Sequence, residues 1–291
     1  MKRLFHEAII VSNEKATNKN ILHELTNLSR NVSKGDTVIF HFSGHGQQIL
    51  TGNSSEEVDL VDEALVPYDA AKRKSATYNG QSHITDDIFG RYIADIRKAA
   101  GPAGLVIAVI DACHSDSMDK GANVSEDVYR GTDEIFGAEA LSADSIAGLR
   151  ELYNAADATP VVTSQGLSNA VFISACKTNQ RNYEINVNDT SYGSLTYYFC
   201  KAYQKTDISD LNVFLSDLYT EMVSDNVMKF HGQTPVIRNS IGWEAPMSEI
   251  FEPTDQQTSI KDDDTYASYW WYAIGAFIVI AIILTLCRKR K

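Results

Sequence analysis

The stretch VIFHFSGHG, residues 38–46, joins a short apolar run to a loop that carries a histidine between two glycines. A second stretch, LVIAVIDACHS at residues 105–115, joins another apolar run to a cysteine. Continuous apolar runs of this length, rich in valine and isoleucine, are typical of strands buried on both faces of a parallel sheet. The two stretches therefore predict two strands that each end next to a reactive side chain.

A helical pattern over residues 85–100 lies between the two runs. Thr85 is suited to cap this helix, and apolar residues recur behind it at helical spacing: Ile88, Phe89, Tyr92, Ile93 and Ile96. A strand, helix, strand crossover predicts parallel strands, so His45 and Cys113 should share the sheet edge where open α/β sheets place their sites. The predicted fold class is α/β, with a mostly parallel sheet flanked by helices.

The pairing of a histidine with a cysteine indicates nucleophilic catalysis. A thiolate is the nucleophile, and an adjacent imidazole removes the thiol proton or stabilises the thiolate as an ion pair. Gly44 and Gly46 permit a tight turn around His45, and backbone N–H groups in such a loop can point at a developing oxyanion. The alternative is a buried structural cysteine and a surface histidine. The catalytic interpretation is favoured because both residues directly follow predicted buried strands.

The motifs HFSGHGQ at residues 41–47 and IDACHS at residues 110–115 resemble those of the caspase-like cysteine peptidases, in particular the metacaspases. Further similar segments lie at residues 15–17, 34–37, 173–176 and 192–196. The resemblance implies a caspase-like fold and a cysteine endopeptidase with His45 and Cys113 as its catalytic dyad. It also implies that self-cleavage is often found in the region after Cys113, where Arg130 and Arg150 are candidate positions.

Two features depart from the family pattern. His45 and Cys113 are 68 positions apart, against roughly 50 in caspases, and we attribute the excess to a polar loop inserted around residues 48–61. Asp116 stands where the family usually has glycine after Cys-His-Ser. A carboxylate near the nucleophile would raise the pKa of the thiol and slow acylation.

The residue two positions before the cysteine bears on substrate choice. Caspases that cut after aspartate carry Gln-Ala-Cys at this point, whereas this chain has Asp111. A carboxylate at the floor of the first substrate pocket would pair with arginine or lysine and repel an acidic side chain. The resemblance implies the same preference and places Ser43 in the pocket lining. The alternative is that Asp111 only binds nearby backbone amides.

A second acidic group includes Asp62, Asp86 and Asp87. Calcium binds where several carboxylate oxygens converge from different loops, and the resemblance implies an activating calcium at these positions and at Asp119. The default interpretation of Asp86 and Asp87 is a favourable interaction with the helix N-terminus. The peptidase chemistry itself requires no cofactor.

The net charge of −12 argues against nucleic acid as a partner and suits protein or peptide substrates that carry basic residues.

Near the C-terminus, residues 269–287 are almost entirely apolar, and 19 residues of helix span roughly 28 Å, close to a bilayer core. Trp270, Trp271 and Tyr272 supply an interfacial belt. The predicted organisation is a peptidase domain at 1–250, an acidic linker at 251–268, a transmembrane helix at 269–287 and a basic tail at 288–291.

The orientation of this predicted single-pass anchor stays open. The basic tail favours a cytoplasmic C-terminus, whereas the lack of a signal-peptide pattern after Met1 favours a peptidase domain in the cytoplasm, which is our prediction. The family's sheet also has a strand between the one predicted at residues 8–12 and the strand before His45, and we expect this chain to lack it.

Together these features predict a membrane-anchored cysteine endopeptidase that cleaves after arginine or lysine. The alternative is a catalytically silent caspase-like module that binds partners at a membrane. Asp116 and the missing strand favour that alternative, because an absent central strand would leave buried backbone groups unpaired.

Overall fold

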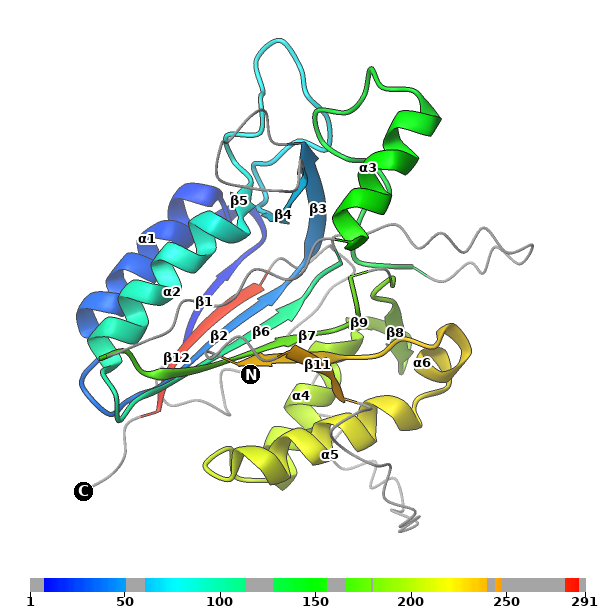
Figure 1. The fold of residues 1–291 in the computed structure, drawn as a ribbon. Coiled ribbons are helices and arrows are strands. Elements are labelled where there is room, and N and C mark those ends of the chain that lie inside the picture. The colour runs from blue at the N-terminus through cyan, green and yellow to red at the C-terminus, as the bar shows by residue number, and fades with distance from the viewer. Residues whose placement is uncertain are drawn as a thin grey trace.

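The computed structural model describes residues 8–50, 61–113, 128–155, 166–178, 180–239, 244–247 and 281–287. They form a three-layer α/β fold in which a seven-stranded sheet lies between helices α1 and α2 on one face and α4 and α5 on the other (Figure 1). The strands, in their order across the sheet, are β1 (Ala8–Ser12), β12 (Ala281–Cys287), β2 (Thr37–Ser43), β6 (Leu105–Asp111), β7 (Asn169–Ser174), β10 (Val236–Asn239) and β11 (Glu244–Pro246). The helices are α1 (Asn18–Asn31), α2 (Asp86–Ala100), α3 (Ala143–Ala155), α4 (Ser194–Lys205), α5 (Leu211–Ser224) and α6 (Asn226–His231), with a 3-10 turn at Asn13–Lys15.

The predicted crossover is present. Strand β2 pairs with β6 in parallel, α2 connects them by way of a smaller sheet, and β6 pairs in parallel with β7. The pairs on either side of these three strands are antiparallel: β1 with β12, β12 with β2, β7 with β10, and β10 with β11. The sheet is therefore mixed rather than mostly parallel.

Burial explains the continuous apolar run of β2. Val38, Phe40 and Phe42 belong to the core beneath α1 and α2, whereas Ile39 belongs to the core beneath α4 and α5. Alternate residues of a strand point to opposite faces of the sheet, so a strand covered by helices on both faces needs apolar residues at consecutive positions.

Helix α2 begins where its sequence indicates. The Thr85 hydroxyl accepts a hydrogen bond from the Ile88 N–H at 3.4 Å, which caps the helix. The predicted apolar face is confirmed, because Phe89, Ile93 and Ile96 are buried. Gly101 ends the helix with a φ of 63°, in the region that favours glycine.

The insertion before the crossover helix is partly ordered as strand rather than loop. Residues 48–50 complete β3, which pairs with β4 in an antiparallel hairpin, and residues 51–60 lie outside the described part of the chain. This smaller sheet consists of β3 (His45–Leu50), β4 (Val61–Val66) and β5 (Ile84–Thr85). A separate two-stranded sheet consists of β8 (Glu184–Val187) and β9 (Thr190–Gly193).

Strand β12 overturns the predicted membrane segment. The transmembrane helix predicted over residues 269–287 is wrong, because residues 281–287 form this strand. Across the described ranges, no helix has both the length and the apolar character needed to span a bilayer. The C-terminal anchor and the localisation inferred from it are wrong for the same reason. A run rich in isoleucine and leucine suits a buried strand as well as a membrane helix, and here backbone pairing on both sides selects the strand.

The position of β12 in the sheet concerns a second prediction, that the chain lacks a strand between β1 and β2. β12 lies between β1 and β2 and is antiparallel to both, with Ile283 opposite Ile10 on one side and His41 on the other. This is the position at which the sheet was expected to have a gap. β12 thus pairs backbone groups of both neighbours that would otherwise need other partners.

We expect a chain that ends at residue 280 to be less stable by at least ~3 kcal/mol, because it loses two ladders of backbone hydrogen bonds worth ~0.5–1.5 kcal/mol each. The control is a chain that ends at residue 287, which keeps β12 and loses only the basic tail. Urea unfolding of both chains, followed by circular dichroism, provides the measurement. Equal unfolding midpoints would contradict the place of β12 in the sheet.

Candidate active site

The parallel pairing of β2 with β6 sets the predicted loops side by side. Ser43 lies opposite Asp111 in the register, and the Gly44 N–H donates a hydrogen bond to the Asp111 carbonyl at 3.2 Å. His45 then begins β3, and Cys113 lies two residues beyond the end of β6. The predicted meeting of His45 and Cys113 at one edge of the sheet therefore has its basis in this register.

A single carbonyl oxygen connects the two loops. The carbonyl of Arg130 accepts hydrogen bonds from the Cys113 N–H at 2.7 Å and from the Gly46 N–H at 3.4 Å. Two backbone donors that converge on one carbonyl oxygen are the arrangement that stabilises the oxyanion formed when such a carbonyl is attacked. Of the two glycines predicted for this role, Gly46 is placed for it. Gly44 is not, because its N–H is used in the bond to Asp111.

Gly131 lies against both predicted catalytic residues. A Cβ at this position would lie 2.6 Å from the Cys113 carbonyl oxygen and 3.0 Å from Cys113 Cβ, so no side chain fits. The His45 imidazole forms a hydrogen bond with the Gly131 backbone. The carbonyl of Arg130 is thus bonded to two backbone donors, and the next residue, Gly131, lies against Cys113 and His45.

The surroundings of His45 favour its neutral form. Burial lowers the pKa of His45 below its ordinary value of 6.5, and the positive charge of Arg130 lowers it further. The hydrogen bond to Gly131 acts in the opposite direction but does not reverse the shift. A neutral imidazole at neutral pH is able to accept a proton from a thiol.

The Cys113 thiol is almost completely buried and has a second thiol as a neighbour. Both Cys113 Sγ and Cys176 Sγ donate to the Gln180 carbonyl, at 3.2 Å and 3.3 Å. The hydrogen bond with Cys113, together with burial, raises the pKa of Cys176 well above its ordinary value. Cys176 therefore stays a protonated thiol and does not compete as a nucleophile.

Asp111 is completely buried at the end of β6, two residues before Cys113. Its carboxylate accepts hydrogen bonds from Asn182 Nδ2 at 2.7 Å, from the Thr196 N–H at 2.8 Å and from the Thr196 hydroxyl. The alternative role, binding of backbone amides, is thus partly present. These bonds hold the carboxylate in a fixed place, from which its charge acts on neighbouring groups.

A basic side chain, that of Arg130, lies close to Asp111 and is 8% exposed. Its Nη1 donates to Ser43 Oγ at 2.9 Å, and its Nη2 forms an ion pair with Glu184 Oε1 at 3.1 Å. A Cβ on Gly193 would overlap Asp111 Oδ2 and would lie 2.6 Å from Arg130 Nε, so the guanidinium also passes close to Asp111. Ser43 and Asp111 thus both lie beside this buried guanidinium.

The sequence assigned no site role to Glu184, Asn182 or Gln233, although the segment 231–236 that contains Gln233 resembles the closing loop of the family. Gln233 supports Asn182 and Ser194 behind the site, because its Nε2 donates to Asn182 Oδ1 at 3.1 Å and to Ser194 Oγ at 3.0 Å. The segments that resemble the family lie on either side of Asn182 and Glu184. These two polar residues stand two positions apart, a spacing that puts both on the same side of an extended segment. The spacing indicates a role only once the segment that pairs with it is known.

The predicted calcium ligands do not form a site within the described ranges. Asp62 lies in β4, and Asp86 and Asp87 lie in the first turn of α2. Among these described residues no group of three or more histidine, cysteine, aspartate or glutamate side chains is placed to hold a metal ion. Asp119 lies outside the described residues, as does Asp116. No step of the chemistry is assigned to calcium.

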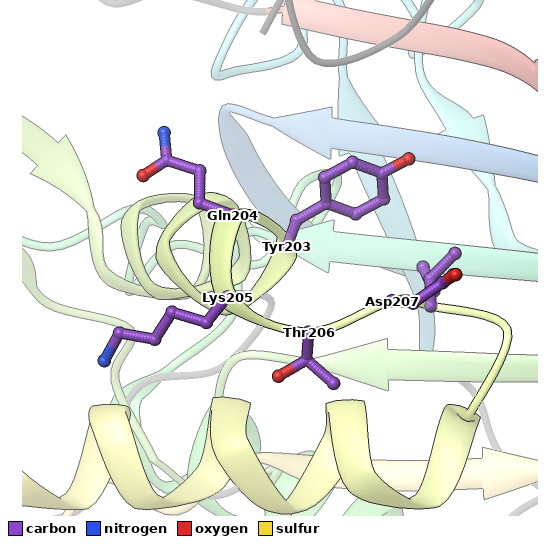
Figure 2. A pocket seen from close by; sticks show the side chains of 6 residues that line it. Tyr203, Gln204, Lys205, Thr206 and Asp207 are labelled. Carbon is purple, nitrogen blue, oxygen red and sulfur yellow. The ribbon is translucent and has the colours of Figure 1, made fainter.

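The pocket in Figure 2 is separate from this site. Its lining consists of Tyr203, Gln204, Lys205, Thr206, Asp207 and Ile208. These residues end α4, whereas the candidate site lies at the start of α4, where Ser194 and Thr196 are. A helix of this length separates its ends by about 18 Å. The pocket contains none of the residues described above.

Comparison with known proteins gives a consistent result. The family model Peptidase_C14, described as the caspase domain, matches residues 1–241. Metacaspase-5 of Trypanosoma cruzi is 36% identical over 104 residues, which are 35% of this chain and 20% of that protein. Metacaspase-1 of Arabidopsis thaliana is 31% identical over 198 residues, 62% of this chain and 47% of that protein.

The chain thus spans between a fifth and about half of the length of these curated relatives. A solved protein structure from Geobacter sulfurreducens aligns with 78% of this chain and 75% of its own, at a TM-score of 0.47 and 19% identity.

We expect Gly193→Ala to lower the free energy of unfolding by ~1–3 kcal/mol, because the added methyl group overpacks a site occupied by Asp111 and Arg130. Gly90→Ala is the matched control, since a Cβ there has nothing within 4 Å and the residue lies within α2. Alanine is favoured over glycine in a helix by up to ~1 kcal/mol. Urea unfolding measures both variants, and equal stability of the two would contradict the packing described for Gly193.

Proposed function

Because the chain belongs to the Peptidase_C14 family of caspase-domain proteins, we propose that it is a cysteine endopeptidase of the metacaspase type that cleaves after arginine or lysine. One observation carries the proposal: the Arg130 guanidinium is buried beside Asp111, where it contacts Ser43 and Glu184. Carboxylates around a closed pocket attract a basic side chain and repel an acidic one. Substrates are therefore proteins or peptides with accessible basic residues.

The proposed acylation uses the two side chains and the two backbone donors in turn. Neutral His45 takes the proton of the Cys113 thiol, and the thiolate attacks the carbonyl carbon of the substrate's basic residue. The resulting oxyanion accepts hydrogen bonds from the Gly46 and Cys113 N–H groups, which already converge on a carbonyl oxygen. His45 then gives its proton to the departing amine, and the C–N bond breaks.

Deacylation reverses these roles. His45 takes a proton from a water molecule, whose oxygen attacks the thioester carbon, and the same donors stabilise the second oxyanion. Collapse releases the carboxylate product and returns the proton to the sulfur of Cys113.

Two interpretations of the sequence, activation by calcium and a catalytically silent binding module, stay predictions. Activation by calcium stays a prediction of the family resemblance, without support from the described carboxylates. The alternative of a catalytically silent partner-binding module rested on Asp116, which lies outside the described residues, and on a gap that β12 occupies. We favour the peptidase because the pocket, the backbone donors and the thiol occur together.

We expect Cys113→Ala and His45→Ala each to lower kcat/KM on peptides with arginine at the cleavage position by ~10³-fold or more, since the two residues act as a unit. Cys200→Ala is the matched control, because Cys200 is a buried thiol whose pKa burial raises to about 12. The measurement is release of a fluorophore from peptides ending in arginine, lysine or aspartate. Preferred cleavage after aspartate, or full activity of Cys113→Ala, would refute the proposal.

The pH dependence of kcat should follow the pKa of His45. Protonated imidazole cannot accept the thiol proton, so activity falls as the pH drops through this pKa. Because burial and a bound guanidinium lower that pKa, the acid limb of kcat should have its midpoint below pH 6.5. A pH series with an arginine peptide at saturation measures it. A midpoint at or above pH 6.5 would contradict the assignment of His45 as the base.

A further inference from the structure

A second histidine of the HFSGHG stretch, His41, is buried within β2. Alternate residues of a strand share a face, so Ile39, His41 and Ser43 point to the side of the sheet that α4 and α5 cover. Ile39 belongs to the apolar core there, and Ser43 lies opposite Asp111 at the polar end of the strand. His41 lies between them and is 2% exposed. A histidine in this place interrupts the apolar pattern of a buried strand, so packing alone does not account for it.

One nitrogen of the His41 ring reaches the residue that binds the Asp111 carboxylate. His41 Nε2 lies 3.0 Å from Thr196 Oγ1. Thr196 binds Asp111 Oδ2 with its backbone N–H, at 2.8 Å, and with its hydroxyl. Ser43 Oγ lies 3.1 Å from the same hydroxyl. Three side chains therefore meet at one hydroxyl group.

The positions of the protons in this cluster follow from the number of donors. A threonine hydroxyl has one proton and two lone pairs, and an ionised carboxylate only accepts. The single Thr196 proton is therefore used in the bond to Asp111. Thr196 Oγ1 then accepts from His41, which places the ring proton on Nε2. The remaining contact, between the two hydroxyls, has Ser43 as its donor.

The direction of these bonds strengthens the hold on the carboxylate. An N–H that donates to a hydroxyl oxygen polarises the O–H of that hydroxyl and makes it a better donor. The His41 N–H also occupies a lone pair of Thr196 Oγ1, which fixes the hydroxyl with its proton toward Asp111. Without this N–H, the hydroxyl is free to turn its proton toward Ser43 instead.

The other ring nitrogen shows what this arrangement costs. Burial lowers the pKa of His41 to about 4, so the ring is neutral at neutral pH and has a single N–H. His41 Nδ1 is buried and has no hydrogen-bond partner in the described part of the chain. An unpaired buried acceptor lowers stability. An apolar ring, such as that of the neighbouring Phe199, would avoid this cost. The advantage of histidine here is the N–H that reaches Thr196.

We propose that His41 is a positioning residue for substrate selection, which acts through the Thr196 hydroxyl to fix the Asp111 carboxylate toward a basic side chain. The inference rests on the proposed function, in which Asp111 selects arginine or lysine. His41 takes no part in the proton transfers, which belong to His45.

The test compares two fluorogenic peptides that differ only at the cleavage position, one with arginine and one with its uncharged analogue citrulline. We expect His41→Phe to lower the ratio of kcat/KM, arginine over citrulline, by ~5-fold or more, because it weakens a hydrogen bond to a charged group. His41→Gln should keep the wild-type ratio, since the glutamine amide carries an N–H at a similar distance from Cβ. His23→Phe is the matched control, because His23 is exposed on α1 at the other face of the sheet.

Two further measurements separate positioning from general damage. In His41→Phe, KM for the arginine peptide should rise while kcat stays within ~2-fold, because Asp111 binds the side chain equally before and during the reaction. Thr196→Val should also lower the ratio, and adding His41→Phe to it should have no further effect, because His41 acts through that hydroxyl. Circular dichroism and thermal unfolding establish that each variant is folded.

The outcomes distinguish this inference from the proposed function. A wild type that prefers arginine, with the same ratio in folded His41→Phe, overturns the inference and leaves the function. A wild type without that preference overturns both. Independent, additive effects of His41→Phe and Thr196→Val overturn the route through Thr196, and a low ratio in His41→Gln overturns the role of the N–H. His41→Leu replaces His41→Phe if the larger ring prevents folding, and failure of both to fold while His41→Gln folds would make the role of His41 structural and overturn the inference.

Discussion

The parallel backbone pairing of β2 with β6 is the interaction on which the site depends. It sets Ser43 opposite Asp111, and the two loops that follow carry His45 and Cys113. The register cannot slip, because a shift of one residue would move Phe40 and Phe42 from the core beneath α1 and α2 to the opposite face. Helix packing on both faces of the sheet therefore fixes the place of the buried polar side chains at the ends of its strands, among them Ser43 and Asp111.

The charge balance around Asp111 explains why the side chain buried beside it is basic. Glu184 pairs with the Arg130 guanidinium, and Asp111 lies beside it with its own oxygens already bonded to Asn182 and Thr196. Carboxylates confined in a poorly solvated space raise each other's free energy unless a cation is present. This buried cluster thus favours a positive side chain, which Arg130 supplies.

Local patterns were enough to predict the elements around the candidate site but not all of their partners. The apolar runs of β2 and β6, the cap and face of α2, and the positions of His45, Cys113, Ser43 and Asp111 followed from residues close together in the sequence. Glu184 and Asn182 reach the site because residues 128–130 pair with 182–184 across a long stretch of chain, and no local periodicity records such a pairing. The Gly44 N–H is bonded to the Asp111 carbonyl, and a glycine beside a histidine does not reveal from sequence which N–H is already bonded.

The wrong prediction of a transmembrane helix at residues 269–287 also arises because a pairing between distant segments leaves no local pattern. The strand found there has a consequence for the candidate site. An apolar run of isoleucine and leucine carries no information on whether lipid or a sheet covers it, and the choice here depends on two strands near the other end of the chain. In the register of β12 with β2, Ala281 lies opposite Ser43. The pocket residue Ser43 is therefore flanked by Asp111 on one side and by the last described strand on the other. Because β2 would become an edge strand without β12, the backbone that positions Ser43 and begins the His45 loop would lose half of its pairing. The backbone of the segment from Ala281 to Cys287 thus supports the candidate active site through the sheet.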